Sequence, residues 1–579
     1  MRTHLFVLAL ASSPFLAAQD KVSPFRCVPA DSDFVLRLAA PAKWKQQFAG
    51  TQVAKLFAGE TLTPLIGAMT EQWEQAITAV RESGEFDADL LEKLVTAYGG
   101  DMVIAGSVDF ASIPAAMEGG DMPHFGVVIS MTPDGTYDFQ KLAAAIQKSA
   151  EEDASGDVSW RDLQVGEVKM RCTTNEDEPN TTLPVVVDGH LVMLVSDDIE
   201  KFAAKALGTG ARFTAAADSR ALFLRANLGP MMKTIIEVAG EQLADRAPMD
   251  IAALMSSLGL NSLDSLSMSI GAEGKHLAGD MSLELTEGNQ GLFGAMTAGL
   301  GAPKMLRYVP ASSETFSVSA FDFGALLRTV AQVWTGLGDS VPMTWEQAQT
   351  QFAEQLKVRL KEDLFDHLGS EMLMLQDVEA QMAAMATGED PEDPLGGING
   401  TCVGVALRDG KAFGESLEKL VRSRGLHAGR KTEEYQGTKV HRLRLAAVVE
   451  IEYAVTDDML LVGLGSGEAS RASLRAILDA RATPAAAGEA PKVAKAALAV
   501  LPADWTGVST MSVSGFFTGF ADGFGPAFAM SSGMDLPEEV QGMLEAMKGL
   551  AGDLKRCELE TLVSTSYTTA RSVVIRYLW

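Results

Sequence analysis

Hydrophobic and polar positions along this chain follow the two periods of a protein that mixes strands with helices. In the first half, apolar residues recur every three to four positions, which places them on one face of a helix. These stretches predict helices at 41–57, 62–82, 90–98, 139–146, 198–207 and 229–244. Short apolar or alternating runs predict strands at 33–38, 101–104, 125–131, 158–163, 167–173, 183–187, 191–195, 221–226, 264–271 and 277–285. Asp188-Gly189 predicts a hairpin turn, because this residue pair suits the tight connection of antiparallel strands.

The second half of the chain repeats this order of elements. The run Val28–Leu38 is echoed at 309–319 and, more loosely, at 501–508. Further matched segments are 94–102 with 364–372, 125–131 with 402–407, 163–168 with 435–440, the hairpin 183–195 with 450–462, the helix 198–207 with 469–479, and the closing strands 264–285 with 557–578. Matched segments in the same order predict an internal duplication.

Short connections between strands, with helices between clusters of strands, favour the α+β class. We therefore expect two tandem copies of an antiparallel or mixed sheet with helices packed mainly on one face. The predicted organisation is a signal peptide at 1–19, a first repeat at 27–286, a glycine-rich joint at 287–305 and a second repeat at 306–579.

The N-terminus has the pattern of an export signal. Arg2 and His4 form a polar start, Leu5 to Leu16 is apolar, and Leu16-Ala-Ala-Gln19 offers small residues for cleavage. The apolar run is shorter than the roughly 20 residues that a spanning helix needs. The sequence predicts a protein exported to the periplasm or beyond, with no transmembrane segment after cleavage.

Charge restricts the partners. The 579 residues include 48 basic and 76 acidic side chains, for a formal net charge of −28. This charge repels polyanions, which argues against nucleic acid and against adsorption to anionic lipid. The hydrophobic fraction of 47% supplies enough material for buried cores, so the acidity is expected to serve solubility.

Four cysteines follow the predicted signal peptide: Cys27, Cys172, Cys402 and Cys557. Each lies in a strand-like run. Export permits disulfides, and four cysteines allow three pairings, but buried free thiols fit the sequence as well. No Cys/His spacing indicates a metal site.

Two short motifs carry a family resemblance. Val28-Pro-Ala-Asp31 opens a strand soon after the signal peptide, and Leu368-Gly-Ser-Glu371 is predicted to end a helix before a strand. In these respects the chain resembles an uncharacterised family of exported bacterial proteins that carries a domain of unknown function. The resemblance implies no activity and no catalytic residues.

The glycine-rich run at 459–467 is the most suggestive motif, because a strand entering glycines before a helix can hold a phosphate. Its spacing is not the dinucleotide fingerprint. The matching positions in the first half, 191–198, have no glycine and end in two aspartates. A plain turn from strand to helix is therefore the favoured interpretation.

Other candidate groups nominate no active site. No G-x-S-x-G element nominates a serine nucleophile. Six histidines follow the predicted signal peptide, and none has HExxH spacing. They are His124, His190, His276, His367, His427 and His441. His190, next to a hairpin turn, and His367, near a helix end, are expected to be exposed. The acidic runs at 151–153, 176–178, 197–198 and 457–458 are expected to be solvated surface.

Methionines cluster in predicted helices. Flexible thioethers suit an apolar groove, although they also fill irregular cores. The clustered residues are Met382, Met385, Met530, Met534, Met543 and Met547.

The sequence thus predicts an exported, non-catalytic binding or structural protein of the bacterial envelope, with no catalytic, cofactor-binding or metal-ligating residues and an unknown envelope partner. Two alternatives stay open: a carrier of an apolar ligand such as lipid or peptide in a methionine-rich groove, and a hydrolase with a dispersed site.

Overall fold

The computed structural model describes the chain over residues 23–57, 78, 99–113, 123–135, 138–152, 159–174, 179–214, 220–244, 251–286, 290–296, 303–378, 380–381, 400–444, 450–464, 468–483, 505–532, 538–569 and 571–579. The protein is α+β, with a large antiparallel sheet and helices. The chain divides into two compact units, one of Met1–Val238 with Asp264–Met281 and one of Ala239–Leu263 with Ser282–Trp579. The predicted signal peptide lies outside the described residues.

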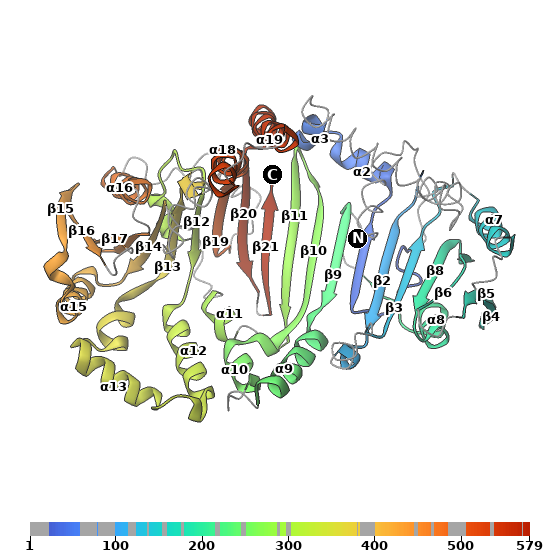
Figure 1. Ribbon diagram of the computed structural model, residues 1–579, viewed down its shortest axis with the longest axis horizontal. Helices are drawn as coiled ribbons and strands as arrows, with labels where there is room; N and C mark the ends of the chain where they lie inside the picture. The colour runs from blue at the N-terminus through green and yellow to red at the C-terminus, as the bar shows by residue number, and fades with distance from the viewer. Residues whose placement is uncertain are drawn as a thin grey trace. The chain divides into compact units, whose positions relative to one another are not determined.

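The first unit contains an antiparallel sheet in the order β10-β9-β1-β2-β3-β8, and β8 also pairs with β6 and β7 (Figure 1). The strands are β1 (Phe34–Leu38), β2 (Met102–Val108), β3 (Phe125–Met131), β4 (Trp160–Val165), β5 (Val168–Thr173), β6 (Asn180–Thr181), β7 (Val185–Val187), β8 (His190–Ser196), β9 (Leu222–Asn227), β10 (Leu263–Glu273) and β11 (His276–Leu285). The helices are α2 (Pro41–Phe48), α3 (Gln52–Phe57), α7 (Phe139–Glu152), α8 (Ile199–Leu207) and α9 (Leu228–Ala244), with a 3-10 turn at Phe110–Ser112. β4 and β5 form a separate two-stranded sheet.

Two apolar cores lie on opposite faces of the first unit's sheet. The core that includes α8 contains Val35, Val103, Ala105, Val128, Val192, Leu194, Phe202 and Ala203. The core that includes α7 contains Leu38, Met102, Met131, Phe139, Leu142, Ala143 and Leu191. Because neighbouring strand residues point to opposite faces, α7 and α8 cover different sides of the sheet. The prediction of helices mainly on one face is wrong for this unit.

A buried ion pair joins β1 to β2. Arg37 and Asp101 are 1% and 4% exposed, and the guanidinium donates to Asp101 Oδ2 at 3.0 and 2.7 Å. Asp101 Oδ1 accepts hydrogen bonds from Ala40 N at 2.9 Å and Lys43 Nζ at 3.2 Å. Burial alone would raise the pKa of Asp101, but the two cations and the backbone donor outweigh it, and the pKa is lowered. The carboxylate is thus satisfied inside the protein.

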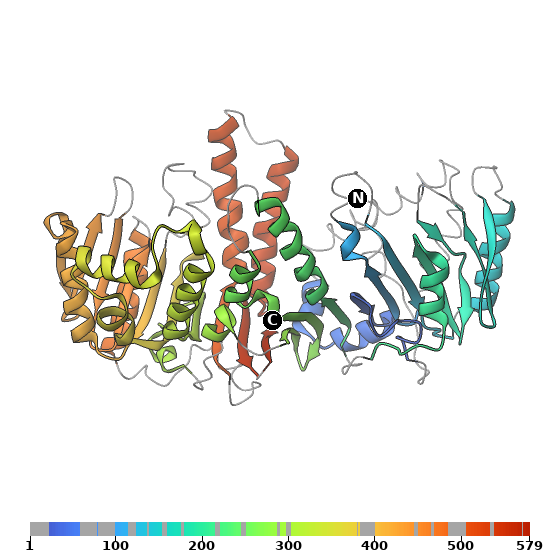
Figure 2. The same ribbon diagram turned by 90° about the horizontal axis from the view of Figure 1, so that it is seen from below.

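The second unit has strands in the order β21-β20-β19-β12-β13-β14-β18-β17-β16-β15, all antiparallel (Figure 1). They are β12 (Phe316–Ala320), β13 (Leu368–Gln376), β14 (Thr401–Leu407), β15 (Lys431–Tyr435), β16 (Thr438–Arg444), β17 (Glu450–Val455), β18 (Met459–Leu464), β19 (Gly507–Ser512), β20 (Thr561–Thr568) and β21 (Ser572–Leu578). The helices are α10 (Ile251–Leu258), α11 (Gly291–Met296), α12 (Phe323–Gly336), α13 (Trp345–Leu356), α15 (Gly410–Ser423), α16 (Glu468–Ala482), α18 (Val513–Ser532) and α19 (Glu538–Arg556). Short 3-10 or π turns lie at Leu260–Ser262, Lys304–Tyr308, Gly338–Ser340, Leu360–Leu364, Phe365–His367 and Leu426–Gly429. Figure 2 shows α18 and α19 side by side.

Several predicted boundaries differ from the structure. The helix expected at 41–57 is divided into α2 and α3, because Thr51 Oγ1 bonds to Phe48 O and accepts from Ala54 N, which ends one helix and begins the next. Leu368-Gly-Ser-Glu371 begins β13 rather than ending a helix. The helices predicted at 62–82 and 90–98 lie outside the described residues, apart from Thr78.

Candidate functional site

A groove of about 410 Å³ opens in the second unit between α15 and the strands β16 and β17. Its lining residues are Gly414, Leu417, Glu418, Gly437, Thr438, Lys439, His441, Tyr453, Val455, Thr456, Asp457 and Arg481. The last three come from the turn after β17 and from the end of α16. The groove therefore combines four separate chain segments, at 414–418, 437–441, 453–457 and 481.

Glycines bring α15 close to its neighbours. Asp409 caps the helix by accepting from Ala412 N at 2.9 Å. A Cβ on Gly410 would lie 2.0 Å from Thr456 O, so only glycine permits this approach of the helix to the turn. One turn later, a Cβ on Gly414 would lie 3.5 Å from Val455 Cγ1, an ordinary contact. The bare backbone at Gly414 leaves space in the groove wall.

Two rings form part of the groove surface. His441 and Tyr453 are opposite each other on β16 and β17, with ring centroids 4.9 Å apart. His441 Nδ1 is 2.8 Å from Thr432 Oγ1. Burial and the nearby Arg430 lower the pKa of His441, although Glu418 opposes them. The ring is thus favoured in its neutral form.

Arginines neutralise the acid on α15. Glu418 accepts hydrogen bonds from Arg422 Nε at 2.7 Å and from both terminal nitrogens of Arg430. Arg430 also donates to Tyr453 Oη at 3.3 Å. The hydrogen bond from Arg430 is the main reason that the pKa of Glu418 falls to about 2. Glu418 therefore fixes the groove wall as part of an ion-pair group.

A second ion-pair group lies at the end of the groove that is formed by the turn after β17 and the end of α16. Arg481 Nε donates to Asp458 Oδ1 at 3.0 Å, and Thr456 Oγ1 donates to the same oxygen at 3.0 Å. The Tyr308 hydroxyl donates to Asp458 Oδ2. Burial alone would raise the pKa of Asp458, but these donors outweigh it, and the pKa is lowered. Arg481 thus faces the groove with its charge already partly compensated.

The remaining charged residues of the lining are Lys439 and Asp457. Both are exposed. Among the described residues, neither side chain has a hydrogen-bonding or ionic partner. Their charges are opposite, yet they form no ion pair with each other. These two side chains are the ones available to a ligand.

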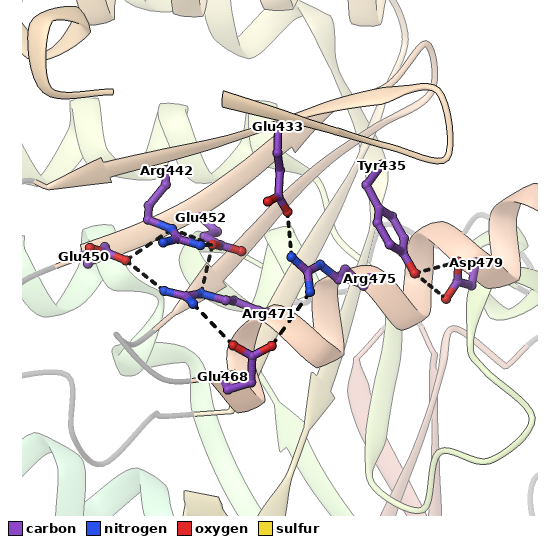
Figure 3. Close-up of polar contacts among 9 residues, drawn as sticks. All are labelled: Glu433, Tyr435, Arg442, Glu450, Glu452, Glu468, Arg471, Arg475 and Asp479. Atoms are coloured by element: carbon purple, nitrogen blue, oxygen red, sulfur yellow. Dashed lines mark hydrogen bonds and ion pairs between the residues drawn. The ribbon is translucent and has the colours of Figure 1, made fainter. Parts of the chain in front are cut away.

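The reverse face of the same strands carries a network of ion pairs (Figure 3). Glu452, 5% exposed, accepts from Arg442 Nη2 at 2.7 Å and from Arg471 Nε at 3.0 Å, and Glu450 bridges the same two arginines at 3.3 and 3.2 Å. Next to them, Arg475 pairs with Glu433 and Glu468, and the Tyr435 hydroxyl donates to both carboxylate oxygens of Asp479 at 3.0 and 2.9 Å. The network links β15, β16 and β17 to α16, and so holds the strands that form the groove.

The histidines predicted from sequence occupy very different places. His190 is not exposed as expected but 0% exposed, with Nε2 3.2 Å from Ser23 O, and burial lowers its pKa. It belongs to β8, whose side chains on that face enter the core. His367 is half-buried. His124 lies 3.5 Å from Asp197 at the surface, and His427 is exposed. Sequence reasoning did not single out His441, which lies in the groove.

The cysteines are free thiols. Cys172 and Cys402 belong to strands, whereas Cys27 lies in a turn and Cys557 follows α19, so these two do not occupy strands as predicted. Burial raises the pKa of Cys27 to about 11 and also raises that of Cys402. In the part of the chain that the structure describes, no group of three or more His, Cys, Asp and Glu side chains is arranged to hold a metal ion.

The acidic and glycine motifs are partly structural. Asp198 caps α8 by accepting from Lys201 N at 3.2 Å, and Asp197 accepts from Phe125 N at 2.8 Å. In the glycine-rich run, 459–464 is β18 and 465–467 lies outside the described residues, as do 153 and 176–178. Met382, Met385 and Met534 lie outside them too.

Comparisons with known proteins give a distant structural similarity over part of the chain. Two crystal forms of TP0453, forms I and III, match with a TM-score of 0.21 each, at 10% and 9% sequence identity. Each match covers 46% of this chain and 79% or 81% of the other. No family model matches the chain, and no curated protein does. Within the described residues, no helix has both the length and the apolar character to cross a membrane.

Proposed function

We propose that this chain is an exported, non-catalytic binding protein of the bacterial envelope, and that the groove between α15, β16 and β17 is its binding site. The observation that carries the proposal is a polar groove whose walls are fixed by ion pairs and which is faced by Lys439 and Asp457, two charges without partners among the described residues. A site whose walls are fixed in advance loses little entropy when it binds a ligand. Export rests on the N-terminal signal pattern.

The non-catalytic role is supported by the partners of His441. Among the residues that the structure describes, the contact that most resembles a nucleophile and its base is the one of 2.8 Å between Thr432 Oγ1 and His441 Nδ1. Thr432 is not among the groove-lining residues. A nucleophilic hydroxyl needs a base that a third group orients, and among the described residues no carboxylate bonds to His441 Nε2.

A hydrolase is the second candidate, because this same contact joins a hydroxyl to a histidine. Its test is turnover of a p-nitrophenyl ester panel by the wild-type protein and by Thr432→Val and His441→Gln. We expect all three proteins to be equally inactive. Turnover by the wild type that both substitutions abolish would replace the binding proposal with a hydrolase.

The strand orders support an internal duplication as the origin of the groove-bearing unit. The strand order in the first unit is β9-β1-β2-β3-β8, and the order in the second is β19-β12-β13-β14-β18. The strands correspond one to one, and within each set they follow one another along the chain in the same order. A helix follows β3 and β14, and another follows β8 and β18. In this proposal, features found in one unit alone were gained after the copy was made. The groove lies beyond β18, where the second unit has three further strands in its sheet.

The alternative function, a carrier of an apolar ligand, has less support than binding in the polar groove. No methionine is among the described residues that line the groove. In the described residues, α18 and α19 pack against each other, and Ala521 on α18 and Leu544 and Leu554 on α19 are buried. Phe516 on α18 is exposed beside the rings of Phe517 and Phe520, but a small exposed apolar group is ordinary on a protein surface.

Native mass spectrometry of protein purified from its own host tests the proposed site. The informative variant is Gly414→Trp, since an indole at this position would fill the groove. Gly552→Trp is the matched control, because Gly552 is an exposed helical glycine of α19 with open space around it. We expect a small-molecule adduct on the wild type and the control but not on Gly414→Trp. An adduct retained equally by all three would exclude the groove as the site.

A further inference from the structure

Some charged side chains of the groove are already in ion pairs, and others are available to bind a ligand. Glu418 is neutralised by Arg422 and Arg430, and Arg481 is paired with Asp458. Lys439 and Asp457 have no such partners among the described residues. A ligand therefore meets one available cation and one available anion.

The register of β16 and β17 separates these two charges. Val440 is opposite Ala454, so Lys439, one residue earlier, faces the position of Val455. Asp457 follows two residues later in the chain. Neighbouring strands are about 4.8 Å apart and the rise is at most about 3.3 Å per residue, so the backbone positions of Lys439 and Asp457 lie within roughly 8 Å of each other. Side chains that start this close together can reach both ends of an extended dipeptide, which are about 7 Å apart.

The surface between the charges is partly apolar. Leu417 on α15 and Val455 on β17 belong to or pack against the same small core, together with the buried ring of Tyr453. The half-buried ring of His441 lies next to that of Tyr453, with the two ring planes tilted by 34°. A ligand with charged ends and a short apolar side chain would complement this order of groups.

We propose that the groove binds a short zwitterionic peptide, with its carboxylate on Lys439, its ammonium on Asp457 and an apolar side chain against Leu417 and Val455. This ligand class rests on the proposed binding function. A ligand that carries only an anion would leave Asp457 unpaired beside it, and one that carries only a cation would leave Lys439 unpaired. Selectivity for both charges follows, because a site rejects a molecule that leaves its polar groups without partners.

Calorimetric titration at low ionic strength tests the ligand class. The probes are L-alanyl-L-phenylalanine, its N-acetyl and C-terminal amide derivatives, 3-phenylpropionate and phenethylamine, which share the phenyl group and differ in charge. We expect the free dipeptide to bind at least about 10-fold more tightly than each other probe, as one charge-assisted contact would give. Equal affinity for 3-phenylpropionate would overturn the zwitterion and assign an anion site.

Substitutions test which side chain binds the carboxylate of the peptide and which binds its ammonium group. Lys439→Met should remove the preference for the free carboxylate over the amide, while the preference for the free amine is retained. Asp457→Asn should do the reverse. The controls are Lys419→Met and Glu434→Gln, exposed residues outside the groove lining that change the net charge equally. If neither Lys439→Met nor Asp457→Asn alters these preferences, the proposed orientation is wrong.

The blocked variant separates the two proposals. If the dipeptide does not bind but another probe binds and is excluded by Gly414→Trp, the ligand class fails and the groove remains the site. If the dipeptide binds Gly414→Trp as tightly as the wild type, the site itself fails.

Discussion

Two hairpins of this protein, β4–β5 and β15–β16, differ in how they attach to their units. β15–β16 extends the sheet of the second unit, because β16 pairs with β17 from Val440↔Ala454 to Arg444↔Glu450. β4–β5 forms a two-stranded sheet of its own, and an isolated bridge between Cys172 and Thr182 and a hydrogen bond from Leu183 N to Arg171 O at 2.8 Å join it to the chain that follows. The chain after β5 passes Pro179 and Pro184 before β7, and proline cannot donate a hydrogen bond to a strand ladder. The chain between β16 and β17 is shorter and has no proline.

The side chains that anchor the two hairpins also differ. On β4–β5, Leu163, Met170 and Cys172 are buried in the core that includes α8. On β15–β16, Arg442 and Glu433 enter the ion-pair network with α16 (Figure 3). The ion pairs with α16 occupy one face of the extended sheet, and α15 and the groove lie on the opposite face. The ion-pair network on one face and the small core of Val421, Leu443 and Tyr453 on the other hold the strands that line the groove.

The largest expected effect is that of Glu452→Ala. This change leaves Arg442 and Arg471 without their buried acceptor, and breaking a buried pair costs about 3 kcal/mol of unfolding free energy. Hydrogen exchange should also become faster in β15 and β16. Glu468→Ala, which removes an exposed carboxylate of the same network, should change stability by less than about 1 kcal/mol. Equal losses for the two variants in denaturant titrations would contradict the importance of the buried carboxylate.

Met170→Ala probes the apolar hairpin. Met170 is 3% exposed, and truncating a buried methionine costs about 2 kcal/mol or more. Because no charge is removed, the loss should be the same at low and high salt, whereas salt should alter the effect of removing charges around Arg442. Urea unfolding at two ionic strengths measures both. A Met170→Ala effect that depends strongly on salt would contradict the proposed difference between the hairpins.

Acid should weaken the groove wall before it affects the apolar hairpin. The pKa of Glu418 is lowered from 4.5 to about 2 in the folded protein. Its contribution to stability is therefore fully present above pH 4.5 and is lost as the pH falls toward 2. Glu418→Gln should remove this part of the pH dependence when unfolding is followed between pH 6 and 3. An unchanged acid profile in the variant would show that Glu418 makes no such contribution.

The smallest expected effect is that of Gly414→Ala. The added methyl group has an ordinary contact with Val455, and alanine stabilises a helix by up to about 1 kcal/mol relative to glycine. We expect a slightly raised melting temperature together with weaker dipeptide binding, because the methyl group narrows the groove. Lower stability would show that the wall at Gly414 is more tightly packed than the structure indicates.

Local patterns predicted much of the fold. The alternation in Phe125–Met131 gave the bounds of β3, and Asp188-Gly189 gave the turn between β7 and β8, where both residues have positive φ. Local patterns did not separate α2 from α3, since the side-chain hydrogen bonds of Thr51 decide that boundary. His190 was misjudged because its environment depends on the sheet face rather than on its distance from a turn.

The groove was not predictable by motif, because its residues come from distant segments that only the strand register brings together. One signal was present in the sequence. Strand alternation places His441 and Leu443 on one face and Arg442 on the other, and pairing 438–444 with 450–455 would have placed Tyr453 beside His441. Lys439 and Asp457 line one groove only because β16 pairs with β17 in this register, and the sequence alone does not give that register.

Hydrogen–deuterium exchange with and without saturating L-alanyl-L-phenylalanine tests the central claim most directly. The account predicts slower exchange confined to α15, β16, β17 and the turn at 456–458 in the wild type, and no change in Gly414→Trp. Protection that appears elsewhere in the chain, or that persists in Gly414→Trp, would contradict the groove as the binding site.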